Sequence, residues 1–300
     1  MTMTPDQALL PSRIARALAI AALAGSVAPA QDTRLAASTP QQQHQALLRE
    51  FNQTARGLWE AKTDEERMAV AGRMPGLTRR FFDWAEENPR DPLAIDSLVQ
   101  VVVQEIWLQN NTAHPGDAAA DLEGKAIALL LQHHVGSASL GPACTRMSYG
   151  FHGACETFLR TVLATSPHRE VQGLACLRLA QFLNGRLRRL DLLAVHPEMA
   201  ARYRGLFGTE YLERLRRQDR AAAGAEIETI FERAAREFGD TKLPYGATAR
   251  HTAESELNEI RNLSIGKEAP ETLGQDQHGA PFKLSDYRGK VVLLYFWSEH

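Results

Sequence analysis

Three cysteines are the residues of this chain closest to a recognisable chemistry, because a thiolate can attack a disulfide. They are Cys144, Cys155 and Cys176, and no two of them stand in a Cys-x-x-Cys motif. An odd number of thiols also leaves at least one without a partner inside the chain. The cysteines by themselves therefore do not predict a redox centre.

The surroundings of these cysteines favour structural thiols. Cys155 and Cys176 lie among Ala, Leu and Phe in stretches with helical periodicity, where a buried and unreactive thiol is the expected state. A glycine-rich segment separates Cys144 from Cys155, which leaves a disulfide between these two open.

Other motifs with catalytic or metal-binding potential are weaker still. His133 and His134 are adjacent, so on a helix they point in different directions and cannot hold one metal ion together. Ser264 and Lys267 match Ser-x-x-Lys, a four-residue pattern that has no companion motif here. The His-Glu-x-x-His, Gly-x-Ser-x-Gly and phosphate-loop patterns do not occur. The sequence thus predicts no catalytic, cofactor-binding or metal-binding residue, and no cofactor.

The first thirty residues have the pattern of a cleaved export signal. Arg13 and Arg16 precede an uncharged apolar stretch at 17–27, and Ala28 and Ala30 supply the small residues that a signal peptidase reads. The stretch is too short to span a bilayer as a helix of the mature protein. A disordered, alanine-rich N-terminus is the alternative. We expect export to the periplasm or another extracytoplasmic space.

The chain divides into four segments. Residues 1–30 form the predicted signal peptide, 31–39 a polar linker, 40–263 an α-helical domain, and 264–300 a segment with β-type residues between glycines and prolines. Export places the last three segments in an oxidising compartment. After signal removal we expect no transmembrane span.

Helical periodicity governs residues 40–263. Thr63, followed by three acidic residues, predicts a helix start. Asn88-Pro89 predicts the end of a helix that carries Phe81, Phe82 and Trp84. The longest irregular stretch is expected between Gly136 and Gly153. Further helices are expected from 92 to about 107, from Asp117 to His134, over 155–183 with a break at Ser166-Pro167, and over 197–207, 210–218, 221–238 and 247–263.

Two parts of the helical domain share a layout. Residues 81–102 and 159–180 both consist of a helix, a polar residue followed by proline, and a second helix. Such a duplication is typical of helical-repeat arrays, but a plain bundle with coincidental spacing explains it equally well. The predicted fold class is therefore mainly α, with a helical bundle or a helical-repeat-like body.

The charge balance gives no reason to expect nucleic acid or an anionic membrane surface as a partner. The 34 basic and 36 acidic residues give a formal net charge of -2. Basic clusters at 186–189 and 214–220 alternate with acidic residues on predicted helices, which indicates solvated faces.

The character of the chain changes at Ile265. Short β-type segments near Thr272-Leu273 and Pro281–Lys283 flank a turn at 275–279, which predicts a hairpin. Ser285 is expected to cap a single helical turn that Gly289 ends.

Seven consecutive apolar residues, 291–297, then predict a strand that is covered on both faces. Only three residues follow this run, too few to supply neighbouring strands or covering helices. Either the helical body covers the run, or the domain to which it belongs is incomplete. We expect an incomplete domain.

The order of these motifs resembles the opening of the redoxin superfamily, whose domains have a thioredoxin-like α/β fold. The matching residues are Ile265–Pro270, His278–Lys290 and Val291–Trp297, within the last 36 residues. The segment is most similar to TlpA/ResA-type thiol-disulfide oxidoreductases, with AhpC/TSA peroxiredoxins as relatives. The resemblance implies that 264–300 is the N-terminal part of a truncated thioredoxin-like domain.

In that family, Phe-Trp is followed by three residues and then by Cys-x-x-Cys at the start of a helix. Ser298-Glu299-His300 match those three positions. The resemblance therefore implies that the cysteine pair and the later cis-proline loop are missing from this chain. It implies thiol-disulfide exchange with a protein disulfide or thiol as substrate for the whole protein, and an inactive 300-residue chain.

Two alternatives stay open. A non-catalytic helical-repeat binding or scaffold protein would use its helical body to hold a protein partner, with the β segment as a remnant. A single cysteine after His300, in place of a pair, would indicate a peroxiredoxin-type peroxidase. The Phe296-Trp297 ending favours disulfide exchange over peroxide reduction.

Overall fold

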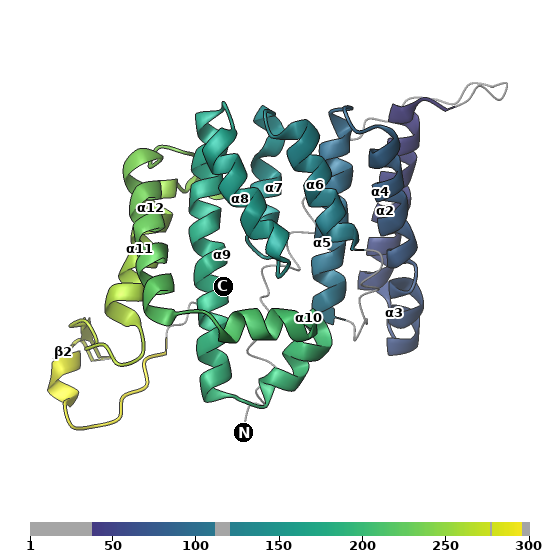
Figure 1. Ribbon diagram of the computed structural model, residues 1–300. Coiled ribbons are helices and arrows are strands. Elements are labelled where there is room, and N and C mark those ends of the chain that lie inside the picture. The colour runs from purple at the N-terminus through teal and green to yellow at the C-terminus, as the bar shows by residue number, and fades with distance from the viewer. Residues whose placement is uncertain (1–37, 112–120, 277, 296–300) are drawn as a thin grey trace.

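Helices that stand side by side in a row form most of the molecule (Figure 1), so the prediction of a mainly α protein is confirmed. The computed structural model describes residues 38–111, 121–276 and 278–295, and for residues 107–111 the backbone alone. α10 (Met199–Arg216) lies across one end of the row. The other helices are α2 (Pro40–Glu60), α3 (Asp64–Ala71), α4 (Met74–Glu87), α5 (Leu93–Asn111), α6 (Leu122–His134), α7 (Gly141–Met147), α8 (Gly153–Thr165), α9 (Arg169–Val195), α11 (Arg220–Glu237) and α12 (Ala249–Asn258), which a short π-helical turn, η5 (Glu259–Leu263), extends.

Side-chain caps fix where the first two of these helices begin. The hydroxyls of Thr39 and Thr63 each accept a hydrogen bond from the backbone of the third helical residue. In return, the side chains of Gln42 and Glu66 accept a hydrogen bond from the backbone N–H of the capping threonine. These reciprocal bonds satisfy donors that a helix start leaves without partners. The helix start predicted at Thr63 is confirmed.

One continuous apolar core runs through the row. α4 packs on α5, α5 on α6, α8 on α9, and α9 on both α7 and α11, so most helices contact their neighbours in sequence. Phe81, Phe158 and Phe231 are among the largest fully buried side chains. Burying one such side chain contributes about 1.5–3 kcal/mol to folding. The shared core therefore stabilises the row as a whole.

The two segments with a helix–proline–helix layout both form pairs of packed helices. α4 ends at Asn88, whose side-chain amide donates a hydrogen bond to the carbonyl oxygen of Trp84, and α5 packs back on α4. α8 ends at Ser166, and α9 packs back on α8. The layout predicted from the sequence is confirmed for both pairs.

The stretch between Gly136 and Gly153, expected to be irregular, is largely helical. A 3₁₀ turn, η3 (Ala138–Leu140), leads into α7, whose Cys144 and Met147 side chains are fully buried. The prediction was wrong because a glycine here serves close packing rather than a loop. A Cβ on Gly141 would come within 2.8 Å of the Leu174 side chain of α9.

α10 consists of two helical segments that meet at Gly208. Gly208 has a φ of 82°, a backbone conformation that glycine adopts without strain. The two separate helices predicted at 197–207 and 210–218 are therefore confirmed. Tyr203 and Tyr211 of α10 pack against the end of α9 in a second, smaller apolar core.

Some predictions fall outside the described residues. These are the signal peptide at 1–30, residues 31–37 of the predicted linker, and the first residues of the helix expected from Asp117. Of that helix, the structure describes α6 from Leu122 onward, where Asp121 caps the first turn.

Candidate functional site

The segment with the redoxin resemblance begins with a β-hairpin. β1 (Leu273–Gln275) pairs antiparallel with β2 (Pro281–Lys283). The Asp276 carboxylate accepts hydrogen bonds from the backbone N–H groups of His278 and Ala280, at 2.8 and 2.9 Å. These bonds close the connection between the strands. The hairpin predicted from the sequence is confirmed.

The helical turn after the hairpin is η6 (Leu284–Tyr287), and its cap differs from the predicted one. The Asp286 carboxylate accepts a hydrogen bond from the Lys283 N–H at 2.9 Å, while Ser285 lies inside the turn. The backbone N–H and the hydroxyl of Ser285 donate to the two carboxylate oxygens of Glu271, at 3.0 and 2.5 Å. The prediction of Ser285 as the cap was wrong because this charged acceptor engages its hydroxyl.

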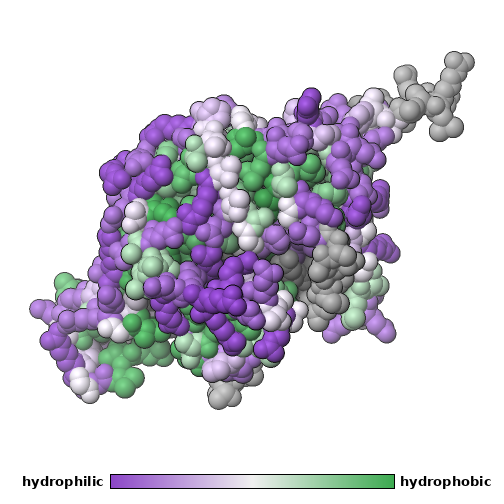
Figure 2. All heavy atoms as spheres, viewed as in Figure 1, coloured by the Kyte–Doolittle hydropathy of each residue, from purple (hydrophilic) through white to green (hydrophobic). Residues whose placement is uncertain are grey.

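The apolar run that follows η6 does not form a strand in its described part. Val291–Tyr295 lies outside the two-stranded sheet, and Val291 and Leu293 are 104% and 89% exposed. Figure 2 shows the resulting apolar surface at the lower left. The strand prediction is wrong for 291–295, because this run pairs with neither strand of the hairpin. Phe296 and Trp297 lie outside the described residues.

The three cysteines are free thiols in the helical core. All three are fully buried. Burial raises the pKa of Cys144 and of Cys176 to about 12, and it also raises the pKa of Cys155. The thiols therefore stay protonated near neutral pH, and the prediction of structural thiols is confirmed for Cys155 and Cys176. Cys144 and Cys155 do not form the disulfide left open by the sequence, because Cys155 faces Glu123 of α6 instead.

A buried thiol–carboxylate pair lies at the start of α8. Cys155 Sγ donates a hydrogen bond to Glu123 Oε1 at 3.3 Å, and Glu123 is 2% exposed. Burial raises the pKa of Cys155, and the negative charge of Glu123 raises it further. A Cβ on Gly150 would come within 2.4 Å of Cys155 Sγ, so the backbone closes tightly over the pair. The pair links α6 to α8 and is unsuited to nucleophilic attack.

Two further side chains with metal-ligand chemistry lie beside the same helix ends. His152 Nε2 is 3.2 Å from Asp121 Oδ1, and its Nδ1 accepts a hydrogen bond from the Ala154 N–H at 3.1 Å. Sequence reasoning missed this grouping because the residues come from positions about thirty apart. Among the described residues, however, no three His, Cys, Asp or Glu side chains stand where one metal ion could join them.

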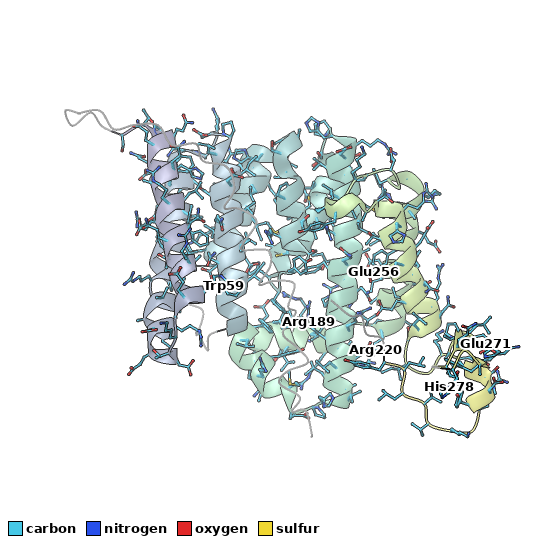
Figure 3. The ribbon with its side chains drawn as sticks, turned by 180° about the vertical axis from the view of Figure 1, so that it is seen from behind. Trp59, Arg189, Arg220, Glu256, Glu271 and His278 are labelled. Carbon is cyan, nitrogen blue, oxygen red and sulfur yellow. The ribbon has the colours of Figure 1, made fainter. Side chains whose placement is uncertain are left out.

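A cluster of arginine and aromatic side chains lies where α8, α9 and α10 meet. Phe151 stacks on Phe207 with 4.0 Å between ring centroids, and the Arg189 guanidinium lies over the Phe151 ring at 4.7 Å. Figure 3 labels Arg189 at this junction. The arginine–aromatic cluster, as we name it, comprises Phe151, Arg186, Arg189, Phe207, Tyr211 and Arg214.

The expectation that the basic residues form solvated faces holds for only some of them. The Arg186 side chain is 17% exposed and binds Glu156 at 2.5 Å. The expectation was wrong for Arg186 and Arg189, because aromatic rings partly cover their guanidinium groups. Phe182 of α9 lies beneath Arg186 at 5.9 Å, and Phe151, which precedes α8, lies beneath Arg189. Other arginines of the two predicted clusters do form exposed ion pairs, namely Arg188 with Glu259, Arg217 with Glu213 and Arg220 with Asp191.

Two concave regions accompany these sites. One, of about 380 Å³, lies between α2, α3 and α4 and includes the ion pair between Glu50 and Arg80. The other, of about 650 Å³, lies between the end of α12 and the hairpin segment, and is lined in part by Asn262, Glu271 and Arg288. Among the described residues, neither region is lined by a cysteine or a histidine.

Within the described part of the chain, no helix combines the length and apolar character needed to cross a membrane. Compared with protein-family models, curated proteins and solved structures, the chain matches none of them.

Proposed function

We propose that this chain carries the helical body and the opening of the redox domain of an exported thiol-disulfide oxidoreductase of the thioredoxin-like class. The observation that carries the proposal is the order of hairpin, capped turn and exposed apolar run within residues 265–295. A run with exposed fractions of 42–104% gains stability when further strands and helices cover it. In the proposal, residues after His300 supply that cover.

The state of the cysteines present supports placing the chemistry in those later residues. Cys144, Cys155 and Cys176 are buried and protonated, so the helical body is proposed to be non-catalytic. In the expected reaction, a thiolate attacks the substrate disulfide and releases one substrate thiolate. A second protein thiolate then attacks the mixed disulfide and releases the other. Two electrons pass to the substrate, and the protein pair becomes a disulfide.

The reading frame beyond codon 300 provides the first test of this proposal. We expect Cys-x-x-Cys directly after His300, and a stop codon there in intact genomic DNA would contradict the proposal. A lone cysteine would instead indicate the peroxidase alternative, with a peroxide as the oxidised substrate. An insulin-reduction assay then compares the extended chain with the 300-residue chain, which is expected to show no turnover.

Export is part of the same proposal and has its own test. The N-terminal pattern at 1–30 predicts a mature protein that begins after Ala30. N-terminal sequencing of the protein purified from the extracytoplasmic fraction is expected to start at Gln31. A protein that keeps Met1 and stays in the cytosolic fraction would contradict export.

A second candidate function is a helical body that binds a protein partner without catalysis. Trp59 on α2 and Met68 on α3 favour it, because these side chains are 63% and 75% exposed on two helices that pack together. Figure 3 labels Trp59. In a crosslinking experiment, the W59S/M68S variant is expected to lose a partner that the Y245S control retains. An equal pattern of crosslinks for both variants would count against this function.

A further inference from the structure

The hydroxyl of Tyr211 is a buried polar group that donates no hydrogen bond to any acceptor among the described residues, while the Arg189 guanidinium approaches it as a donor. Tyr211 is 6% exposed, and a tyrosine hydroxyl buried to this extent usually finds a partner. Burial raises the pKa of Tyr211, while the nearby positive charges of Arg189, Arg186 and Arg214 act in the opposite direction. The surrounding guanidinium groups are donors only, so they offer no acceptor for the hydroxyl proton.

The charges around this hydroxyl are not balanced. Arg186 forms an ion pair with the Glu156 carboxylate, at 2.5 Å. Arg189 and Arg214 form no ion pair with any side chain in the described ranges. Two positive charges and one unused hydroxyl donor therefore share the same place.

Aromatic rings and a helix end hold these arginines in place. The Arg189 guanidinium lies over the Phe151 ring at 4.7 Å, and the Arg214 guanidinium lies 5.9 Å from the centroid of the Tyr211 ring. The Nη1 atom of Arg214 would be 3.2 Å from a Cβ on Gly153, the first residue of α8. Stacking restricts the guanidinium groups in advance, and a helix N-terminus favours negative charge beside it.

We propose that the arginine–aromatic cluster binds a phosphate-like oxyanion, which accepts hydrogen bonds from Arg189, Arg214 and the Tyr211 hydroxyl. Two unpaired guanidinium groups match the double negative charge of phosphate, whereas a carboxylate would leave one positive charge uncompensated. The bound oxyanion also provides the acceptor that the Tyr211 hydroxyl lacks. This site is distinct from the proposed redox chemistry, and it would operate whether or not the chain continues into a redox domain.

Titration of the full 300-residue protein with inorganic phosphate tests the site. Isothermal titration at pH 7.5, with chloride at matched ionic strength as the reference, is expected to give saturable binding of phosphate. We expect R189Q, R214Q and Y211F each to weaken binding by about tenfold or more. The R216Q variant, on the same helix as Arg214, provides the matched control and is expected to bind like the original protein.

A parallel titration with phosphoserine distinguishes the two possible sources of the oxyanion. Tighter binding of phosphoserine than of phosphate indicates a phosphomonoester ligand, and equal or weaker binding indicates the free ion.

The Tyr211→Phe variant separates binding from a merely structural role. It removes the hydroxyl and keeps the buried ring, so the variant is expected to unfold no more easily than the original protein in the absence of phosphate. Loss of the phosphate response without loss of stability supports the site. The proposal is overturned if phosphate acts no differently from chloride, or if Y211F, R189Q and R214Q all bind phosphate as the original protein does.

Discussion

Cys155 lies in the first turn of α8, where the free N–H groups of a helix ordinarily stabilise a thiolate. Burial and the Glu123 carboxylate reverse this tendency and raise the pKa of Cys155. Cys144 and Cys176 are raised to a pKa of about 12 by burial. A thiol-specific reagent at pH 8 is therefore expected to label the native chain on the order of 100-fold more slowly than the chain in 6 M guanidinium. Rapid labelling of any one cysteine in the native protein, located by mass spectrometry, would contradict this account.

His44 gives the helical body a dependence on acid. It is 1% exposed and packs against Trp84, with 4.8 Å between ring centroids. Burial lowers the pKa of His44 from its usual 6.5, so the unfolded chain binds more protons than the folded chain as pH falls. Its contribution to stability is complete above about pH 6.5 and decreases below that value.

Urea unfolding tests this dependence. Between pH 7.5 and pH 5.5 the free energy of unfolding is expected to fall by about 1 kcal/mol, and by less in the His44→Phe variant. His134, whose pKa is lowered by burial in the same way, accounts for part of the remaining dependence. If the stability of the His44→Phe variant depends on pH as much as that of the original protein, then His44 binds protons equally well in the folded and the unfolded chain, which would contradict this account.

Sequence reasoning located most elements because their ends carry local signals. Thr63 caps a helix, Asn88-Pro89 ends one, and Gly208 separates the two halves of α10. It missed α7, because glycine at position 141 looks like a loop residue until the side chain of Leu174 is known to lie against it. It missed the arginine–aromatic cluster for a related reason. The rings of Phe151 and Tyr211 come from positions sixty apart, and no local pattern brings them together.

Close packing at a glycine also leads to a prediction for α9. A Cβ on Gly173 would come within 2.2 Å of Thr241 Oγ1 and 3.0 Å of Phe238 Cβ, both of which follow α11. Gly173→Ala is expected to lower the free energy of unfolding by about 1–3 kcal/mol, because backbone and side chains have to move apart. Gly224→Ala on α11 is the matched control, since nothing lies within 4 Å of its Cβ position. Alanine there is expected to stabilise the helix by up to about 1 kcal/mol. Equal effects of the two substitutions in urea unfolding would contradict the close packing of α9.

Across the whole molecule, the helical row and the C-terminal segment differ in how they are held. Most helices of the row share one core of buried side chains, and α10 packs in a smaller second core. The hairpin has three residues in each strand, and residues 264–270 that lead into it are exposed. Two-stranded hairpins of this size are marginal in water without further packing. Order in the C-terminal segment therefore depends on what else covers it.

Hydrogen exchange measures this difference directly. In the 300-residue chain, amides of Val291–Tyr295 are expected to exchange at rates close to those of an unfolded peptide, because they are exposed and outside the sheet. Amides in the middle of α9 are expected to exchange only through opening of the shared core, and they serve as the internal reference. In a chain extended past His300, the proposed redox domain would add strands beside this run, and the same five amides would become protected. Slow exchange at Val291–Tyr295 in the 300-residue chain would show that the helical body already covers the run. The exposed apolar surface would then no longer support a larger sheet, and the partner-binding function of the helical row would become the better explanation of the chain.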